Sequence, residues 1–154
     1  MSRLLFLDVD GVLTTTLCPN EMVPSCVERL DRILAATGAA LVISSSWRAT
    51  GIGPDSELQT GLRRICREMD GHLERFERIA SRLHGATARM PSGTRQDEIE
   101  QYVRVHRPQR YAAVDDWPRE FASPAPGWLV LTDAAQGLDP EAEARLIELL
   151  SSPR

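Results

Sequence analysis

The chain has 154 residues, with 18 basic and 22 acidic side chains and a net charge of −4. This length suits a single domain with a sizeable core, and we expect residues 1–154 to form one domain. The acidic balance argues against a protein that coats nucleic acid through a general basic surface, but it leaves room for a local basic groove. Because the chain contains no lysine, a permanent cation in any functional site must be an arginine.

Helix and strand patterns alternate along the chain, which is typical of an α/β fold with a mostly parallel sheet. The apolar run Leu4–Leu7 predicts a central strand that is buried on both faces. Pro24–Thr37 has apolar residues at helical spacing and stops before Gly38. The other expected elements are strands at Ala39–Ser44, Arg110–Val114 and Trp128–Thr132, and helices at Ser56–Met69, Leu73–Leu83, Thr94–Val105 and Pro140–Leu150.

The three cysteines and the amino terminus bear on the cellular compartment. Cys18, Cys26 and Cys66 have no metal-binding spacing, and free thiols fit a reducing environment. The amino terminus lacks the pattern of a signal peptide, and no apolar run approaches the length of a membrane span. We therefore expect a soluble cytoplasmic protein without a membrane partner, in an oligomeric state that the sequence leaves open.

Two aspartates follow the first predicted strand directly. Asp8 and Asp10 come at its carboxyl end, where open α/β sheets place their ligands, and Gly11 lets the chain turn sharply away. A pair of carboxylates held at such an edge attracts a hard cation. A calcium-binding helix-loop-helix does not fit, because the glycine spacing differs and a strand precedes the loop.

The segment DVDGVL, at residues 8–13, resembles the first motif of the haloacid dehalogenase (HAD) superfamily. The resemblance implies a Rossmann-like three-layer sandwich in which Asp8 is the nucleophile and Asp10 is the general acid and base. The segments Asp8–Ser45 and Arg95–Asp115 are too short to hold a capping domain. The longer segment between Ser45 and Arg95 has room for two helices that would partly roof the site.

The second motif of this superfamily is a serine or threonine at the end of the second strand. Ser45 is the best candidate in the stretch SSSWR, with Ser44 or Ser46 as alternatives if the register slips by one. We expect Ser45 and Ser46 to contact the phosphoryl group. Trp47 has two readings, core packing or stacking on a base. Arg48 likewise suits either a substrate contact or a structural ion pair.

The third and fourth motifs of the superfamily supply a cation and an acidic pair. Arg95 is the candidate cation, one residue after Thr94, which predicts a helix N-cap with an approximate capping box to Asp97; Arg89 is the alternative. By the resemblance Asp116 binds Mg²⁺ together with Asp8 and the backbone carbonyl of Asp10. Asp115 either assists in metal binding or holds the arginine.

The resemblance extends to one branch of small superfamily members, the HAD domains of bacterial Swiss-army-knife RNA-repair proteins. The matching features are SSWR, R-x-x-E-I from Arg95, VDD from Val114, TD at Thr132–Asp133 and GL at Gly137–Leu138. They imply a magnesium-dependent phosphatase that forms an aspartyl-phosphate, with phosphorylated substrates that include nucleic-acid ends such as the 3′ phosphate of RNA. The arginines expected to border such a site are Arg48, Arg63, Arg64, Arg67, Arg89 and Arg95.

Two other functions remain open from the sequence. A non-catalytic phosphate-binding or regulatory HAD-like domain would keep the fold without turnover, and a phosphotransferase would pass the phosphoryl group to another acceptor. The intact pair Asp8 and Asp10 argues against the non-catalytic domain, and by the resemblance an aspartate at position 10 favours phosphatase or mutase chemistry.

Overall fold

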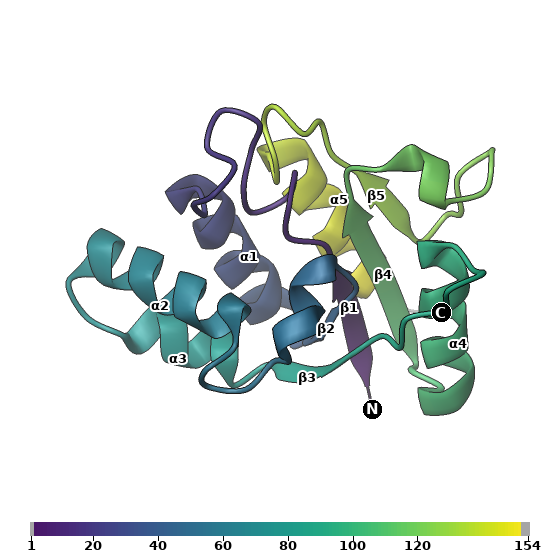
Figure 1. Cartoon of the computed structure of the whole chain (residues 1–154), viewed down its shortest axis with the longest axis horizontal. Helices are drawn as coiled ribbons and strands as arrows, with labels where there is room; N and C mark the ends of the chain where they lie inside the picture. Colours follow the sequence, from purple (N-terminus) through teal and green to yellow (C-terminus); the bar gives the residue numbers. More distant parts are fainter. Residues whose placement is uncertain (1, 152–154) are drawn as a thin grey trace.

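The computed structural model describes residues 2–151, which contain a five-stranded sheet with every strand parallel (Figure 1). The strand order is β3-β2-β1-β4-β5, so β1 is central, as its apolar sequence predicts. The bounds are β1 Arg3–Leu7, β2 Ala40–Ile43, β3 Leu83–Ala86, β4 Arg110–Asp115 and β5 Leu129–Leu131. The carboxyl ends of all five strands therefore meet at one edge of the sheet.

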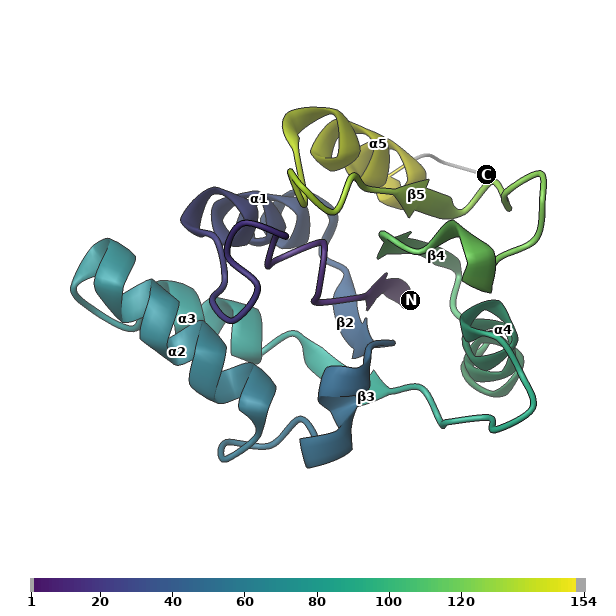
Figure 2. The same ribbon diagram turned by 45° about the horizontal axis from the view of Figure 1, so that its top comes forward.

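Helices cover both faces of the sheet and produce the expected three layers (Figure 2). One face carries α1 (Pro24–Thr37), α2 (Glu57–Asp70), α3 (Glu74–Ala80) and α5 (Pro140–Ser151), and the other carries α4 (Arg95–His106). Short 3-10 helices, η1 (Ser46–Thr50) and η2 (Pro118–Glu120), follow β2 and β4. The described residues include no large cap, which confirms the expected fold class.

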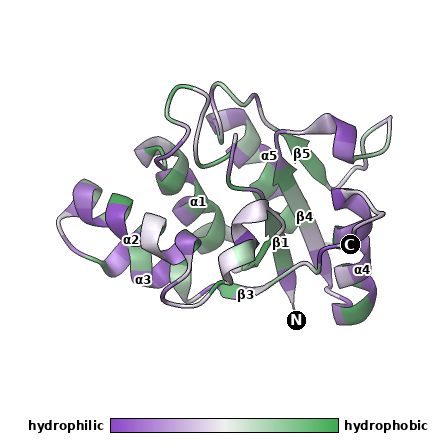
Figure 3. Cartoon of the chain, viewed as in Figure 1, coloured by the Kyte–Doolittle hydropathy of each residue, from purple (hydrophilic) through white to green (hydrophobic). Residues whose placement is uncertain are grey.

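The alternation of strand side chains decides which residues reach each layer. Leu5 and Leu7 pack into the core beneath α1 and α5, whereas Leu4 and Phe6 pack on the side of α4. Figure 3 shows the corresponding apolar strands between helices with polar outer faces. By this period of two, Asp8 continues the row of Leu4 and Phe6 and lies on the α4 side of the sheet.

The structure departs from the sequence prediction between residues 73 and 86. The helix predicted at Leu73–Leu83 ends at Ala80, and the unpredicted strand β3 follows it at the edge of the sheet. The sequence LHGA is too short and too polar to predict a strand, and it becomes one by pairing with β2. Its glycine, Gly85, lies against Tyr102, whose hydroxyl would be 2.7 Å from an added Cβ atom.

Of the two helices between Ser45 and Arg95, only α2 approaches the strand ends, where its first turns line a pocket together with Asp10 and Trp47. Both α2 and α3 pack in the same layer as α1, and they share its core cluster. No helix within residues 2–151 has the length and apolar content needed to cross a membrane. The prediction of a single domain also covers Met1 and residues 152–154, which lie outside the described residues.

Candidate active site

Three aspartates from two strand ends come together at the carboxyl edge of the sheet. One carboxylate oxygen from each of Asp8, Asp115 and Asp116 lies within 4.8 Å of the other two. Asp8 follows β1 and Asp115 ends β4, and these strands pair in register from Arg3 to Leu7. The two acidic motifs are therefore neighbours in space because β4 adds next to β1.

Arg95 is the cation at this cluster. Its Nη1 lies 2.8 Å from Asp115 Oδ2 and 3.5 Å from Asp8 Oδ1, and its side chain is mostly buried. The capping box predicted at Thr94 is confirmed, since its hydroxyl accepts from the Asp97 backbone and the Asp97 carboxylate accepts from the Thr94 backbone. This cap begins α4 at Arg95 and points the first side chain of the helix at the strand ends.

Asp115 uses both of its oxygens within the protein. Oδ2 accepts a hydrogen bond from Arg95, and Oδ1 accepts one from the backbone N–H of Trp117 at 2.9 Å. Burial raises the pKa of Asp115, and Arg95 partly offsets that effect. Of the two roles that the sequence left open, this arrangement fits a residue that holds the arginine.

Asp116 packs against the glycine of the first motif. The backbone of Gly11 has a φ of 80°, and a Cβ atom placed there would collide with the Asp116 carboxylate. The Gly11 carbonyl also accepts a hydrogen bond from Thr132 at 2.8 Å. Only glycine therefore allows both the turn after β1 and the close approach of Asp116 to Asp8.

The cluster has more negative charge than its arginine can balance. Burial, followed by the nearby charge of Asp115, raises the pKa of Asp8 to about 9. Without a metal, Asp8 thus keeps its proton at neutral pH. Three buried or half-buried carboxylates with hard oxygen donors and one arginine form a site that fits a divalent cation such as Mg²⁺.

This pKa predicts how the stability of the metal-free protein depends on pH. The folded protein holds the Asp8 proton up to a pH of about 9, whereas the unfolded chain releases it near 3.8. Stability should therefore fall as pH rises from about 4 to about 9. Thermal denaturation in a chelator should show a steeper decline for wild type than for Asp8→Asn. Equal slopes for the two proteins would contradict the raised pKa.

Asp10 is not part of this cluster and is exposed. Its carboxylate accepts hydrogen bonds from Thr14 Oγ1 at 3.2 Å and from Trp47 Nε1, which is 3.2 Å from each of its oxygens. The Trp47 ring is half-buried against the core and also lines two pockets, one of them shared with Asp10, so it packs on the core while its stacking on a base stays a prediction. The hydrogen bond from the Trp47 indole N–H to Asp10 was not predicted, because the two residues are 37 positions apart in the sequence.

The three serines after β2 occupy different positions. Ser44 follows Ile43, the partner of Leu7 in the sheet, so it lies beside Asp8 and on the same face. Its hydroxyl is buried and has no hydrogen-bond partner among residues 2–151. Ser45 is also buried, and its Oγ accepts from the Trp47 backbone N–H at 2.9 Å. Ser46 is exposed at the edge of a pocket.

Arg48 forms a buried ion pair. Its Nη2 lies 3.0 Å from Glu98 Oε1, and its Nη1 donates to Thr87 Oγ1 at 3.2 Å. Of its two interpretations, the ion pair is the one present in the structure, although the side chain also lines a pocket. Glu98 is the acidic residue of the R-x-x-E-I stretch and precedes buried Ile99, but its ion pair with Arg48 was not predicted.

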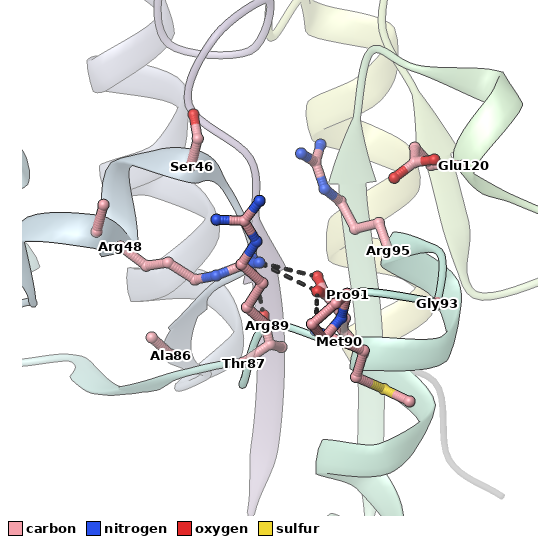
Figure 4. Close-up of a pocket in the computed structure, with 12 residues that line it drawn as sticks. Ser46, Arg48, Ala86, Thr87, Arg89, Met90, Pro91, Gly93, Arg95 and Glu120 are labelled. Carbon is pink, nitrogen blue, oxygen red and sulfur yellow. Dashed lines mark hydrogen bonds and ion pairs between the residues drawn. The ribbon is translucent and has the colours of Figure 1, made fainter.

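The arginines predicted to border the site separate into two groups. Arg48, Arg89 and Arg95 line one pocket next to the carboxylates (Figure 4). The other three lie on α2, outside this pocket: Arg63, Arg64 and Arg67. Arg95, and not the alternative Arg89, contacts Asp8 and Asp115.

Comparison with known families identifies one match. The model of the family described as the HAD domain in Swiss Army Knife RNA repair proteins matches residues 4–142. No curated protein and no solved structure matches the chain significantly. The matched range contains every residue of the candidate site.

Proposed function

We propose that this chain, which belongs to the family of HAD domains in Swiss Army Knife RNA repair proteins, is a magnesium-dependent phosphatase acting through an aspartyl-phosphate. The observation that carries the proposal is the cluster of Asp8, Asp115 and Asp116, with Asp10 two residues beyond Asp8. A family of phosphatase type and an acidic cluster at a strand edge both support it.

Asp8 and Asp116 would hold the ion, together with the backbone carbonyl of Asp10. Asp115 contributes charge nearby, but its oxygens already bind Arg95 and a backbone N–H. When bound, Mg²⁺ would keep Asp8 ionised and offset the charge of a phosphate dianion. That charge is needed because the metal-free site leaves Asp8 protonated at neutral pH.

In the first step a carboxylate oxygen of Asp8 attacks phosphorus. A bond from Asp8 to phosphorus forms, the bond to the ester oxygen breaks, and the leaving oxygen takes a proton from Asp10. Arg95 lies within 3.5 Å of Asp8 and donates to the phosphoryl oxygens. Ser44 is suited to the same task, since its buried hydroxyl lacks a partner, and Ser45 lies next to it.

In the second step water releases the phosphate. Asp10, now a carboxylate, takes a proton from the water, whose oxygen attacks phosphorus and frees Asp8. Trp47 and Thr14 hold the Asp10 side chain through their hydrogen bonds. Neither contact involves the three clustered carboxylates, which fits a division in which Asp8 attacks and Asp10 transfers the proton.

For the substrate we propose a terminal phosphate on nucleic acid, the 3′ phosphate of RNA in particular. The family description and the three arginines beside the site support this substrate. The absence of a large cap within residues 2–151 also supports it, because a polymer end needs an open approach.

A phosphatase panel with magnesium and a chelator tests the proposal. Purified protein should hydrolyse aryl phosphate and 3′-phosphorylated oligonucleotides in Mg²⁺, and the chelator should abolish both activities. The oligonucleotides should be better substrates than mononucleotides, and added salt should reduce this preference. Failure to hydrolyse any phosphate monoester would instead favour a non-catalytic phosphate-binding domain. Equal rates for oligonucleotides and mononucleotides would refute only the polymer substrate.

A further inference from the structure

A pocket of about 670 Å³ adjoins the carboxylate site and shares Arg95 with it. One wall is formed by η1 and by the loop that connects β3 to α4, and the other by the start of α4 and by Glu120. Figure 4 shows Arg89 and Arg95 on these two walls, with both guanidinium groups extending into the space between them. A substrate bound at Asp8 would therefore have room for a further group on this side.

The loop that carries Arg89 is anchored on both sides of this residue. Before it, Thr87 is buried and accepts a hydrogen bond from Arg48. After it, the backbone N–H of Met90 donates to Glu98 Oε2 at 2.8 Å. Arg48 and Glu98 form one buried ion pair, so a single network holds both anchors. The backbone of Arg89 is thus positioned before any ligand arrives.

Arg89 is the cation of this pocket without a carboxylate partner among residues 2–151. Arg48 is paired with Glu98, and Arg95 is paired with Asp115 and Asp8. Arg89 takes part in none of the ion pairs present and is exposed to solvent. Glu120, the other acidic residue of the pocket, lies on the wall of Arg95 (Figure 4). The wall of Arg89 therefore has uncompensated positive charge.

We infer that this pocket binds a second phosphate group of the substrate through Arg89. The inference rests on the proposed phosphatase function, because the first phosphate lies at Asp8. The planar guanidinium group of an arginine binds phosphate oxygens through two parallel hydrogen bonds. Because the backbone of Arg89 is already anchored, less conformational entropy is lost on binding. The substrate class is a phosphate monoester with another phosphate one nucleotide unit away, such as a nucleoside 3′,5′-bisphosphate or a 3′-phosphorylated strand.

The test compares a nucleoside 3′,5′-bisphosphate with the matching nucleoside monophosphates at constant ionic strength. Wild-type protein should have a higher kcat/KM for the bisphosphate, mainly through a lower KM. In Arg89→Gln the ratio of kcat/KM for the bisphosphate to kcat/KM for each monophosphate should fall about tenfold. Arg104→Gln is the matched control, an exposed arginine on α4 outside the pocket, and should keep the wild-type ratio. Arg89→Lys should retain part of the preference.

The inference is wrong if Arg89→Gln keeps the wild-type ratio, or if wild-type protein does not prefer the bisphosphate. Its failure is separable from that of the proposed function. If wild-type protein hydrolyses no monoester, the binding of the bisphosphate, measured by calorimetry, tests the pocket independently of turnover. About tenfold weaker binding to Arg89→Gln than to wild type and Arg104→Gln would then support the pocket, and equal binding to all three would overturn it.

Discussion

Replacement of Asp8 by asparagine should abolish the hydrolysis of aryl phosphate in Mg²⁺. A carboxamide is a poor nucleophile and a neutral ligand, so the variant loses both the attacking oxygen and one anionic metal ligand. We expect kcat to fall by at least about a thousandfold, as is typical when a covalent nucleophile is removed. Steady-state release of 4-nitrophenolate measures this loss.

The fold of Asp8→Asn should remain intact, because Asp8 already holds a proton in the metal-free protein. Unchanged circular dichroism would confirm this control. A variant that keeps substantial turnover would exclude the aspartyl-phosphate. In wild-type protein, a phosphoryl mimic such as beryllium fluoride should bind on the Asp8 carboxylate, and this binding should be lost in Asp8→Asn.

Asp10→Asn and Asp116→Ala should separate proton transfer from metal binding. Asp10 lies outside the carboxylate cluster, and its proposed metal contact is a backbone carbonyl that the substitution keeps. We expect Asp10→Asn to lower kcat by roughly 10²–10⁴-fold while magnesium and phosphate still bind. Asp116→Ala removes a carboxylate from the cluster and should weaken magnesium binding by more than about tenfold.

Calorimetric titration with Mg²⁺ and with phosphate distinguishes the two variants. Equal loss of magnesium affinity would contradict the proposed division of roles. The leaving group gives a second readout. 4-Nitrophenolate is stable enough to leave without a proton, whereas an alkoxide must be protonated as it leaves. In a single turnover, Asp10→Asn should slow the release of an alcohol more than that of 4-nitrophenolate. Trp47→Phe, which removes the indole donor to Asp10, should show a smaller effect of the same kind.

The strand ends and the helix start of the site could be predicted from local sequence. An apolar run that stops at Asp8, and another that stops at Asp115 and Asp116, each place carboxylates at the edge of a parallel sheet. The cap at Thr94 likewise begins α4 where it was predicted. These features depend on residues a few positions apart, and backbone hydrogen bonding and side-chain period act at that range.

Contacts between distant segments could be decided only by the tertiary structure. They include the pairing of β3 with β2, the register that sets Ser44 beside Asp8, the hydrogen bond from Trp47 to Asp10 and the ion pair of Arg48 with Glu98. Each depends on sheet register or on the packing of one element against another, neither of which leaves a local pattern. The sequence by itself thus determined which chemical groups reach the edge of the sheet. Packing decided their partners, because an arginine or tryptophan side chain is long enough to have several possible partners until the surrounding core selects one.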